Sequence, residues 1–281
     1  MSRTLITEAA ERLAAAGVAS PRHDAEALAA HVLGVPRGRL ALVEPEALAS
    51  ALPAYASAVA RRAAREPLQH VVGSAPFRRL ELAVGPGALI PRPETELLID
   101  AVLAWLRTAD LTGLTVPRVV DLGTGTGALA LAIADEFRSV VWAVERDPAA
   151  LAWAARNIAA TGLAVTLVAG DMADALSELD GTVDVVVANP PYLALDVLAE
   201  LEPEVRDHDP ATALFAGPDA LAAIRTVESS ARRLLRPGGL VVVEHGDDQA
   251  ASAPACFAGW SDVTDHLDLA RRPRYLTAVH P

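Results

Sequence analysis

Residues 119–134, VVDLGTGTGALALAIA, decide the fold of this chain. The apolar run that ends at Leu122 predicts a buried strand, and the alanine- and leucine-rich run after the glycines predicts a helix. Between them, Gly123, Gly125 and Gly127 allow a tight turn and let a ligand approach the backbone closely. A strand, a glycine turn and a helix in this order are typical of many nucleotide-binding folds, so the glycines alone do not identify the ligand.

The alternation of strands and helices continues on both sides of this turn. Strands are expected at residues 118–122, 140–144, 164–169, 183–188 and 240–244, and helices at residues 94–106, 128–137, 148–161 and 219–235. Strands that alternate with helices predict a mostly parallel sheet with helices on both faces, so the fold class is α/β.

The first 72 residues read as short helices instead, with Pro21 in a first turn and Gly34 at a helix end. Apolar and polar residues then alternate over residues 77–84, and Gly85-Pro86-Gly87 turns the chain, which predicts a hairpin. We therefore expect a helical domain at residues 1–72, a hairpin linker at residues 73–91 and a second domain at residues 92–281.

Acidic residues end the strands that follow the glycine turn. Glu145 stands where a carboxylate accepts hydrogen bonds from ribose hydroxyls in related folds. Asp171 and Met172 follow the third strand, where they can accept from an adenine amino group and pack on its ring. A dinucleotide fold fits the turn and Glu145 as well, and both carboxylates can be solvated strand ends.

The fourth strand is followed by Asn189-Pro190-Pro191-Tyr192, where proline stops the strand because it has no N–H to donate. This stretch can be a plain terminator, but with residues 121–127 it resembles the class I S-adenosylmethionine methyltransferases that alkylate planar amino nitrogens. Such a nitrogen is a poor nucleophile because its lone pair is delocalised. The Asn189 side-chain oxygen and the Pro190 carbonyl can hold its two hydrogens and turn the lone pair towards the methyl group, while Tyr192 stacks on the planar group. Positioning of this kind contributes on the order of 7–11 kcal/mol in well-oriented reactions.

Four further segments are similar to the PrmC/HemK family, the bacterial glutamine N5-methyltransferases of peptide chain release factors. They are Pro67-Leu68-Gln69-His70 with Gly73, residues 90–96 (IPRPETE), residues 204–210 (EVRDHDP) with Ala213-Leu214-Phe215, and Glu244-His245-Gly246. The resemblance covers nearly the whole chain. It implies a Rossmann-like class I S-adenosylmethionine methyltransferase sheet with a small N-terminal helical domain and a connecting β-hairpin. Glu145 and Met172 depart from it, because aspartate and an aromatic residue are more usual there.

The resemblance also implies a reaction and its site. The acceptor is the glutamine of the Gly-Gly-Gln loop of class-1 release factors, S-adenosylhomocysteine is the by-product, and the N-terminal helices help to bind the factor. The implied cofactor-binding residues are Asp121, Gly123, Thr124, Gly125, Thr126, Gly127, Glu145, Asp171, Met172 and Asn189. The implied substrate-binding residues are Asn189, Pro190, Pro191 and Tyr192, of which Asn189, Pro190 and Tyr192 are catalytic. Acids such as Glu94 suit the first turn of a helix, and no role is assigned to Arg92, Glu204 or His208.

Composition narrows the partners. The net charge of −12 disfavours a phosphate-binding surface. All 24 basic residues are arginine, and the absence of lysine excludes lysine Schiff-base chemistry. Cys256 is the only cysteine, and no histidine spacing predicts a metal site. We find no signal peptide and no apolar run of membrane-spanning length, and we expect a cytoplasmic monomer without direct nucleic-acid contacts.

Three other functions share some of these features. A glutamine methyltransferase of a ribosomal protein has the same Asn-Pro-Pro-Tyr chemistry, so this stretch cannot separate the two. A nucleic-acid adenine-N6 methyltransferase needs a basic surface, which the charge disfavours. A cofactor-binding protein without catalysis is disfavoured because Asn189 and Tyr192 are both present.

Overall fold

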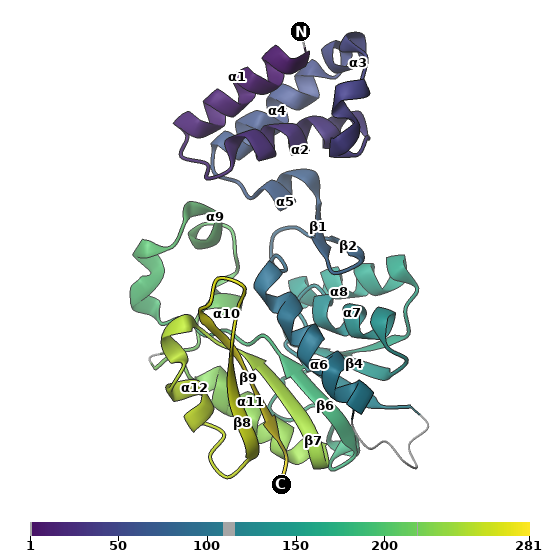
Figure 1. The fold of residues 1–281 in the computed structure, drawn as a ribbon, viewed down its shortest axis with the longest axis vertical. Coiled ribbons are helices and arrows are strands. Elements are labelled where there is room, and N and C mark those ends of the chain that lie inside the picture. The colour runs from purple at the N-terminus through teal and green to yellow at the C-terminus, as the bar shows by residue number, and fades with distance from the viewer. Residues whose placement is uncertain (1, 109–115, 218) are drawn as a thin grey trace. The chain divides into compact units, whose positions relative to one another are not determined.

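The computed structural model describes residues 2–108, 116–217 and 219–281. The chain divides into two compact units, of which the first is Met1–Ser74 with Leu201–His208 and the second is Ala75–Glu200 with Asp209–Pro281 (Figure 1). The first unit therefore contains eight residues that the chain contributes from the middle of the second. The sequence patterns gave no sign of this insertion, because a short polar segment has no hydrophobic period that assigns it to a core.

The first unit is a bundle of short helices. Its elements are α1 (Ser2–Ala15), α2 (Pro21–Leu33), η1 (Arg37–Leu42), α3 (Pro45–Ser50), α4 (Leu52–Ala63), α5 (Leu68–Val72) and α9 (Pro203–Arg206). Helix α2 begins at Pro21 and is followed by Gly34, whose φ of 63° is the left-handed conformation that glycine adopts without strain. The core of this helical bundle contains Leu13, Leu28 and Val59, each of which is almost completely buried.

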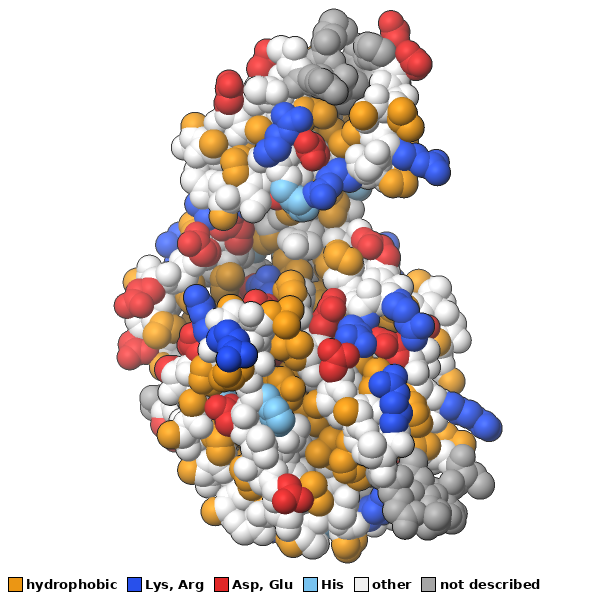
Figure 2. Space-filling model, viewed as in Figure 1, with side chains coloured by type: hydrophobic (Ala, Val, Ile, Leu, Met, Phe, Trp, Pro, Cys, Tyr) orange, Lys and Arg blue, Asp and Glu red, His pale blue; other side chains and the backbone are white. Residues whose placement is uncertain are grey.

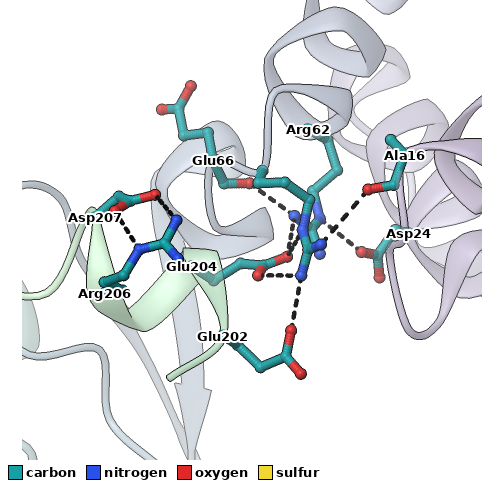
Figure 3. Close-up of polar contacts among 9 residues, drawn as sticks. Ala16, Asp24, Arg62, Glu66, Glu202, Glu204, Arg206 and Asp207 are labelled. Atoms are coloured by element: carbon teal, nitrogen blue, oxygen red, sulfur yellow. Dashed lines mark hydrogen bonds and ion pairs between the residues drawn. The ribbon is translucent and has the colours of Figure 1, made fainter. Parts of the chain in front are cut away.

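Buried ion pairs attach α9 to α4 within this unit (Figure 3). The Arg62 guanidinium donates from Nε to Asp24 Oδ2 at 2.8 Å, and its Nη1 lies 2.7 Å from Glu204 Oε1. Arg65 donates to both Glu204 oxygens, at 2.8 and 2.6 Å. Partial burial by itself raises the pKa of Glu204, but hydrogen bonds from Arg65 and Arg62 outweigh it and lower this pKa to about 2. Glu204 is therefore ionised at neutral pH and ties residues 201–208 to the bundle.

The second unit is built on a seven-stranded sheet in the order β5-β4-β3-β6-β7-β9-β8. The strands are β3 (Arg118–Leu122), β4 (Val140–Glu145), β5 (Val165–Ala169), β6 (Val183–Ala188), β7 (Leu235–Glu244), β8 (Ser261–Leu267) and β9 (Pro273–Val279). The five strands from β5 to β7 run parallel, and β9 pairs antiparallel with both β7 and β8. The α/β class and the mostly parallel sheet are thus confirmed, and β8 and β9 complete an edge that the sequence left undefined.

Helices cover both faces of this sheet (Figure 1). Helices α6 (Glu96–Thr108), α7 (Ala128–Glu136) and α8 (Pro148–Thr161) pack on one face, and α11 (Ala222–Leu234) and α12 (Ser252–Ala255) pack on the other. Strand β6 is buried along its whole length and is apolar except for Asp184, whose carboxylate accepts from the Arg118 N–H and from Arg236. The remaining short elements are η2 (Pro93–Thr95), η3 (Ser177–Leu179), η4 (Leu195–Glu200), α10 (Ala211–Leu214) and η5 (Asp247–Gln249).

The predicted hairpin exists, but it turns elsewhere. Strands β1 (Ser74–Phe77) and β2 (Leu80–Ala83) are joined at Arg78, whose φ is 54° and whose guanidinium bonds Glu136 at 2.8 and 2.9 Å. The glycines expected to form the turn serve another purpose. A Cβ on Gly85 would lie 2.4 Å from Trp153 of α8, and one on Gly87 would lie 2.6 Å from Ala149. Glycine is needed there for close packing.

The hairpin packs against the core of the second unit. Phe77 and Leu82 are buried in the same core as α6 and α7. The expected boundary after residue 72 therefore lies close to the observed division after Ser74, but the hairpin folds with the second unit.

The helix expected at residues 219–235 begins later, at Ala222, and the strand expected at residues 240–244 begins earlier, at Leu235. The register against β6 explains the difference, because Val183 pairs with Leu235 and Val185 pairs with Leu240. The intervening Pro-Gly-Gly residues form a bulge within one strand rather than a separator. No helix within the described residues is long and apolar enough to span a membrane.

Candidate active site

A cavity of about 610 Å³ lies at the carboxyl ends of β3, β4 and β6. Strand β3 pairs with β4 on one side and with β6 on the other, so the chain changes direction across the sheet at this point. Ligands of open α/β sheets bind at such a point, because the loops on either side diverge and leave a crevice. The volume lies in the range of sites for small molecules and cofactors.

Most of the residues predicted from the sequence meet at this cavity. Those that line it are Gly123, Thr124, Gly125, Thr126, Glu145, Asp171, Met172, Asn189, Pro190 and Pro191. Asp121, Gly127 and Tyr192 are not among the lining residues. Their proposed contacts with cofactor or substrate therefore stay predictions, and each has a different place in the structure.

The glycine turn after β3 has the backbone that its sequence predicts. Gly123, Gly125 and Gly127 have φ values of 75°, 58° and 86°, which side chains other than glycine rarely adopt. A Cβ on Gly125 would meet nothing within 4 Å, since this residue faces the cavity. A Cβ on Gly127 would lie 3.3 Å from Leu131, so this last glycine lets the start of α7 pack closely.

Asp121 lies beneath the turn and is completely buried. Its Oδ2 accepts from Thr124 Oγ1 at 2.5 Å and from the Ala130 N–H at 3.1 Å. Its Oδ1 has no hydrogen-bond partner among the described residues. Burial raises the pKa of Asp121 to about 7, against the lowering effect of these two bonds. A completely buried carboxylate oxygen without a partner is unusual, and this one lies beneath the turn, outside the cavity lining.

The two acidic strand ends behave differently. Glu145 is buried and accepts three backbone N–H groups, from Gly125, Arg146 and Asp147, at 2.8–2.9 Å. It therefore holds the glycine turn in place as well as lining the cavity. Asp171 is exposed to solvent in part, and its pKa is lowered by the Ala173 N–H and then by Arg146, whose Nη1 lies at 3.1 Å.

Asn189 ends β6 within a network that the sequence patterns did not predict. Its Nδ2 donates to Thr95 Oγ1 at 3.1 Å, and Thr95 Oγ1 donates to Glu244 Oε2 at 2.6 Å. The Tyr192 hydroxyl donates to the other oxygen, Glu244 Oε1, at 3.2 Å. Thr95 and Glu244 lie in two of the family-like segments, IPRPETE and Glu-His-Gly, and this was the only signal that could have indicated them.

Two further segments, to whose residues the sequence analysis gave no role, border the cavity. Arg92 lines it and forms an ion pair with buried Asp209. Leu193, directly after Tyr192, forms a backbone bridge with Phe215, which also lines the cavity. Residues 209–216 thus lie against the stretch that follows Asn189, as a wall of the same site.

Comparison with known proteins agrees with this site. Residues 4–73 match the family described as PrmC N-terminal domain, and residues 100–200 match the methyltransferase small domain. A release factor glutamine methyltransferase of Streptomyces coelicolor is 52% identical over 97% of this chain and 96% of its own length. One of Mycolicibacterium smegmatis is 51% identical over 99% and 97%.

A relative named for a different substrate also matches over most of both chains. The 4-amino-L-phenylalanine/4-methylamino-L-phenylalanine methyltransferase of Streptomyces pristinaespiralis is 41% identical over 92% of this chain and 89% of its own length. Among solved structures, the catalytic domain of hMettl16 in complex with an RNA hairpin has a TM-score of 0.54 at 21% identity, over 71% of this chain and 75% of its own. At this identity the likeness shows the fold alone.

Identity above 50% over nearly the full length of two relatives, with the glycine turn and Asn-Pro-Pro gathered at one cavity, decides the family. The chain belongs to the release factor glutamine methyltransferases.

Proposed function

We propose that this protein transfers the methyl group of S-adenosylmethionine to the side-chain nitrogen of the glutamine in the Gly-Gly-Gln loop of class-1 release factors. The observation that carries the proposal is the 52% identity over 97% of the chain to a release factor glutamine methyltransferase. The residues that line the cavity support it, because they offer one set of groups for a nucleoside and another for an amide.

The cavity suits the methyl donor on three counts. The turn from Gly123 to Gly125 leaves its backbone open to the cavity, as a ligand that lies against it requires. Asp121 lies beneath the turn, outside the cavity lining, and fixes the lining residue Thr124 by accepting from its hydroxyl at 2.5 Å. Glu145 retains acceptor capacity for ribose hydroxyls, because a carboxylate has about four acceptor positions. When bound, S-adenosylmethionine supplies a methyl group on a positively charged sulfur.

The acceptor nitrogen is held by Asn189 and Pro190. The Asn189 side-chain oxygen and the Pro190 carbonyl accept the two hydrogens of the glutamine amide, and this aligns the nitrogen lone pair with the methyl carbon. The nitrogen forms a bond to that carbon while the carbon–sulfur bond breaks and its electron pair goes to sulfur. The nitrogen then loses one proton to water, and S-adenosylhomocysteine leaves.

A second candidate acceptor is a small aromatic amine. It is favoured by the 41% identity to the methyltransferase of 4-amino-L-phenylalanine, whose amino nitrogen is also planar. The same two acceptors hold such a nitrogen, so the site geometry does not distinguish the two substrates. The margin in identity, 52% against 41%, favours the release factor.

Nucleic acid is the less suitable acceptor for this surface. Figure 2 shows basic side chains interspersed with acidic ones on the face drawn, without a basic stripe. The net charge of −12 also repels the negatively charged phosphate backbone of a nucleic acid.

The test is transfer of labelled methyl from S-adenosylmethionine to a purified class-1 release factor. The same factor with its Gly-Gly-Gln glutamine changed to alanine, 4-amino-L-phenylalanine, a ribosomal protein mixture and duplex DNA are assayed beside it. We expect label on the unchanged factor alone. Label on the amine with none on the factor would overturn the choice of acceptor while keeping the site.

A substitution in the glycine turn tests the donor site. Gly125→Ala places a methyl group at a φ of 58° and into the cavity, whereas Gly162→Ala places one at a φ of 67° in the turn after α8. Both cost about 1–2 kcal/mol of stability, because each is strained in the same way. Overpacking of the ligand costs about 1–3 kcal/mol more in Gly125→Ala alone, so we expect about a tenfold or greater loss of S-adenosylmethionine affinity by calorimetry. Equal donor affinity in the two variants contradicts this assignment.

A further inference from the structure

The Asn189 side chain must present a defined atom to the cavity, because only its oxygen accepts a hydrogen from the acceptor amide. The amide can rotate by half a turn and exchange its oxygen and nitrogen at almost no cost in shape. Something other than packing therefore has to select the orientation. The partner of Asn189 in the structure is Thr95, at 3.1 Å.

The hydrogens available in the network decide which way the Asn189 amide is turned. Thr95 has one hydroxyl hydrogen, and Glu244 Oε2 lies 2.6 Å from its oxygen. An ionised carboxylate accepts only, so the hydroxyl hydrogen goes to Glu244 and only lone pairs of Thr95 remain for Asn189. Asn189 must then turn its Nδ2 towards Thr95, and its Oδ1 is left for the cavity that it lines.

We propose that Thr95 and Glu244 are positioning residues, which set the orientation of the Asn189 amide so that its oxygen faces the acceptor nitrogen. The inference rests on the proposed function for its acceptor, but the orientation itself does not. A proton on Glu244 reverses the relay. The protonated carboxyl donates to Thr95, the Thr95 hydroxyl then donates to Asn189, and the Asn189 NH₂ group is turned to the cavity, where it cannot accept.

The surroundings of Glu244 make this reversal accessible near neutral pH. Glu244 is completely buried at the end of β7, and burial raises its pKa to about 7. Hydrogen bonds from Thr95 and Tyr192 and the charge of Arg274 on β9 act against this rise, and the charge of Glu94 adds to it. Neighbouring His245 makes its contacts elsewhere, with the Gly246 carbonyl and Asp265. The ionised, orienting form therefore prevails above about pH 7 and is lost below it.

Three substitutions separate this role from a merely structural one. Thr95→Val keeps the shape of the side chain and removes the hydroxyl, and we expect kcat to fall about 10- to 100-fold, the scale seen when the partner that orients a site residue is removed. Thr95→Ser keeps the hydroxyl and should retain the wild-type rate. Glu244→Gln does not titrate, so its rate should lack the acidic limb of the pH profile that has its midpoint near 7 in the wild type. Thr95→Val should lack that limb too, because Asn189 no longer senses Glu244.

A direct observation of the amide is also available. The chain has only two asparagines, Asn157 and Asn189, so protein labelled with ¹⁵N-asparagine has two side-chain NH₂ signals. Asn157 donates to the Ala83 and Thr126 carbonyls, at 3.0 and 2.9 Å, and serves as the reference. We expect the Asn189 signal to titrate with a midpoint near pH 7 in the wild type and not in Thr95→Val, while that of Asn157 stays fixed.

The two proposals can fail separately. A wild-type enzyme that labels no release factor but shows the Asn189 titration contradicts the acceptor and supports the relay. An active wild type whose Thr95→Val variant keeps both its rate and its acidic limb overturns the relay, as does a Thr95→Ser variant that is as slow as Thr95→Val.

Discussion

Asn189→Ala is expected to lower the rate of methyl transfer about a thousandfold. The variant loses the side-chain oxygen that we propose holds one hydrogen of the acceptor amide, and removal of one preorganised group at a reacting centre costs about 10²–10³ in kcat. It also frees the acceptor nitrogen to rotate, so that part of the advantage of orientation is lost as well. Single-turnover transfer to the release factor, at saturating donor and acceptor, measures the effect.

The control for Asn189→Ala is donor binding. Asn189 is one of many residues that line the cavity, whereas the glycine turn and Glu145 are untouched, so S-adenosylmethionine affinity should change less than the rate. Since Asn189 is only half-buried, the thermal midpoint should also stay close to that of the wild type. A variant that transfers methyl within tenfold of the wild-type rate shows that the acceptor nitrogen is held by other groups.

Arg62→Ala is expected to destabilise the N-terminal unit by about 3–5 kcal/mol, the usual cost of removing one partner from a buried ion pair. The Arg62 side chain is 7% exposed, and its loss leaves Asp24, 8% exposed, without its guanidinium partner. Glu204 keeps its pair with Arg65 but loses its partner on α4. Residues 201–208 should therefore detach from the bundle as well.

Hydrogen exchange measures both effects in one experiment. Amides of α2, α4 and residues 201–208 should exchange faster in Arg62→Ala, whereas those of β3 and β6 serve as an internal reference within the second unit. Arg61→Ala is the matched control, because the neighbouring Arg61 forms an exposed pair with Glu66 and such pairs contribute about 0–1 kcal/mol. Equal loss of protection in the two variants would refute the importance of burial here.

Local patterns predicted the elements that surround the site. Helix α8 begins and ends where the proline and glycine of its sequence place it, and the glycine turn has the positive φ values expected of it. The meeting of Gly125, Glu145 and Asn189 also follows from sequence order, because parallel strands bring their carboxyl ends to one edge. The same patterns misplaced the hairpin turn, since Gly85 is required by Trp153, a contact that no local period reports.

The sequence by itself determined the α/β class and the succession of strands along the chain, and it predicted Asn189 and Pro190 as the groups that suit a planar nitrogen. Only the tertiary structure decided that Thr95 and Glu244, 149 residues apart, share one hydrogen bond, and that Glu204 joins Arg65 of the N-terminal unit across 139 residues. The physical reason is the separation along the chain over which each influence acts. Periodicity, proline and glycine act on the backbone within a few residues, whereas a buried hydrogen bond needs its partners within about 3 Å after the whole core has packed.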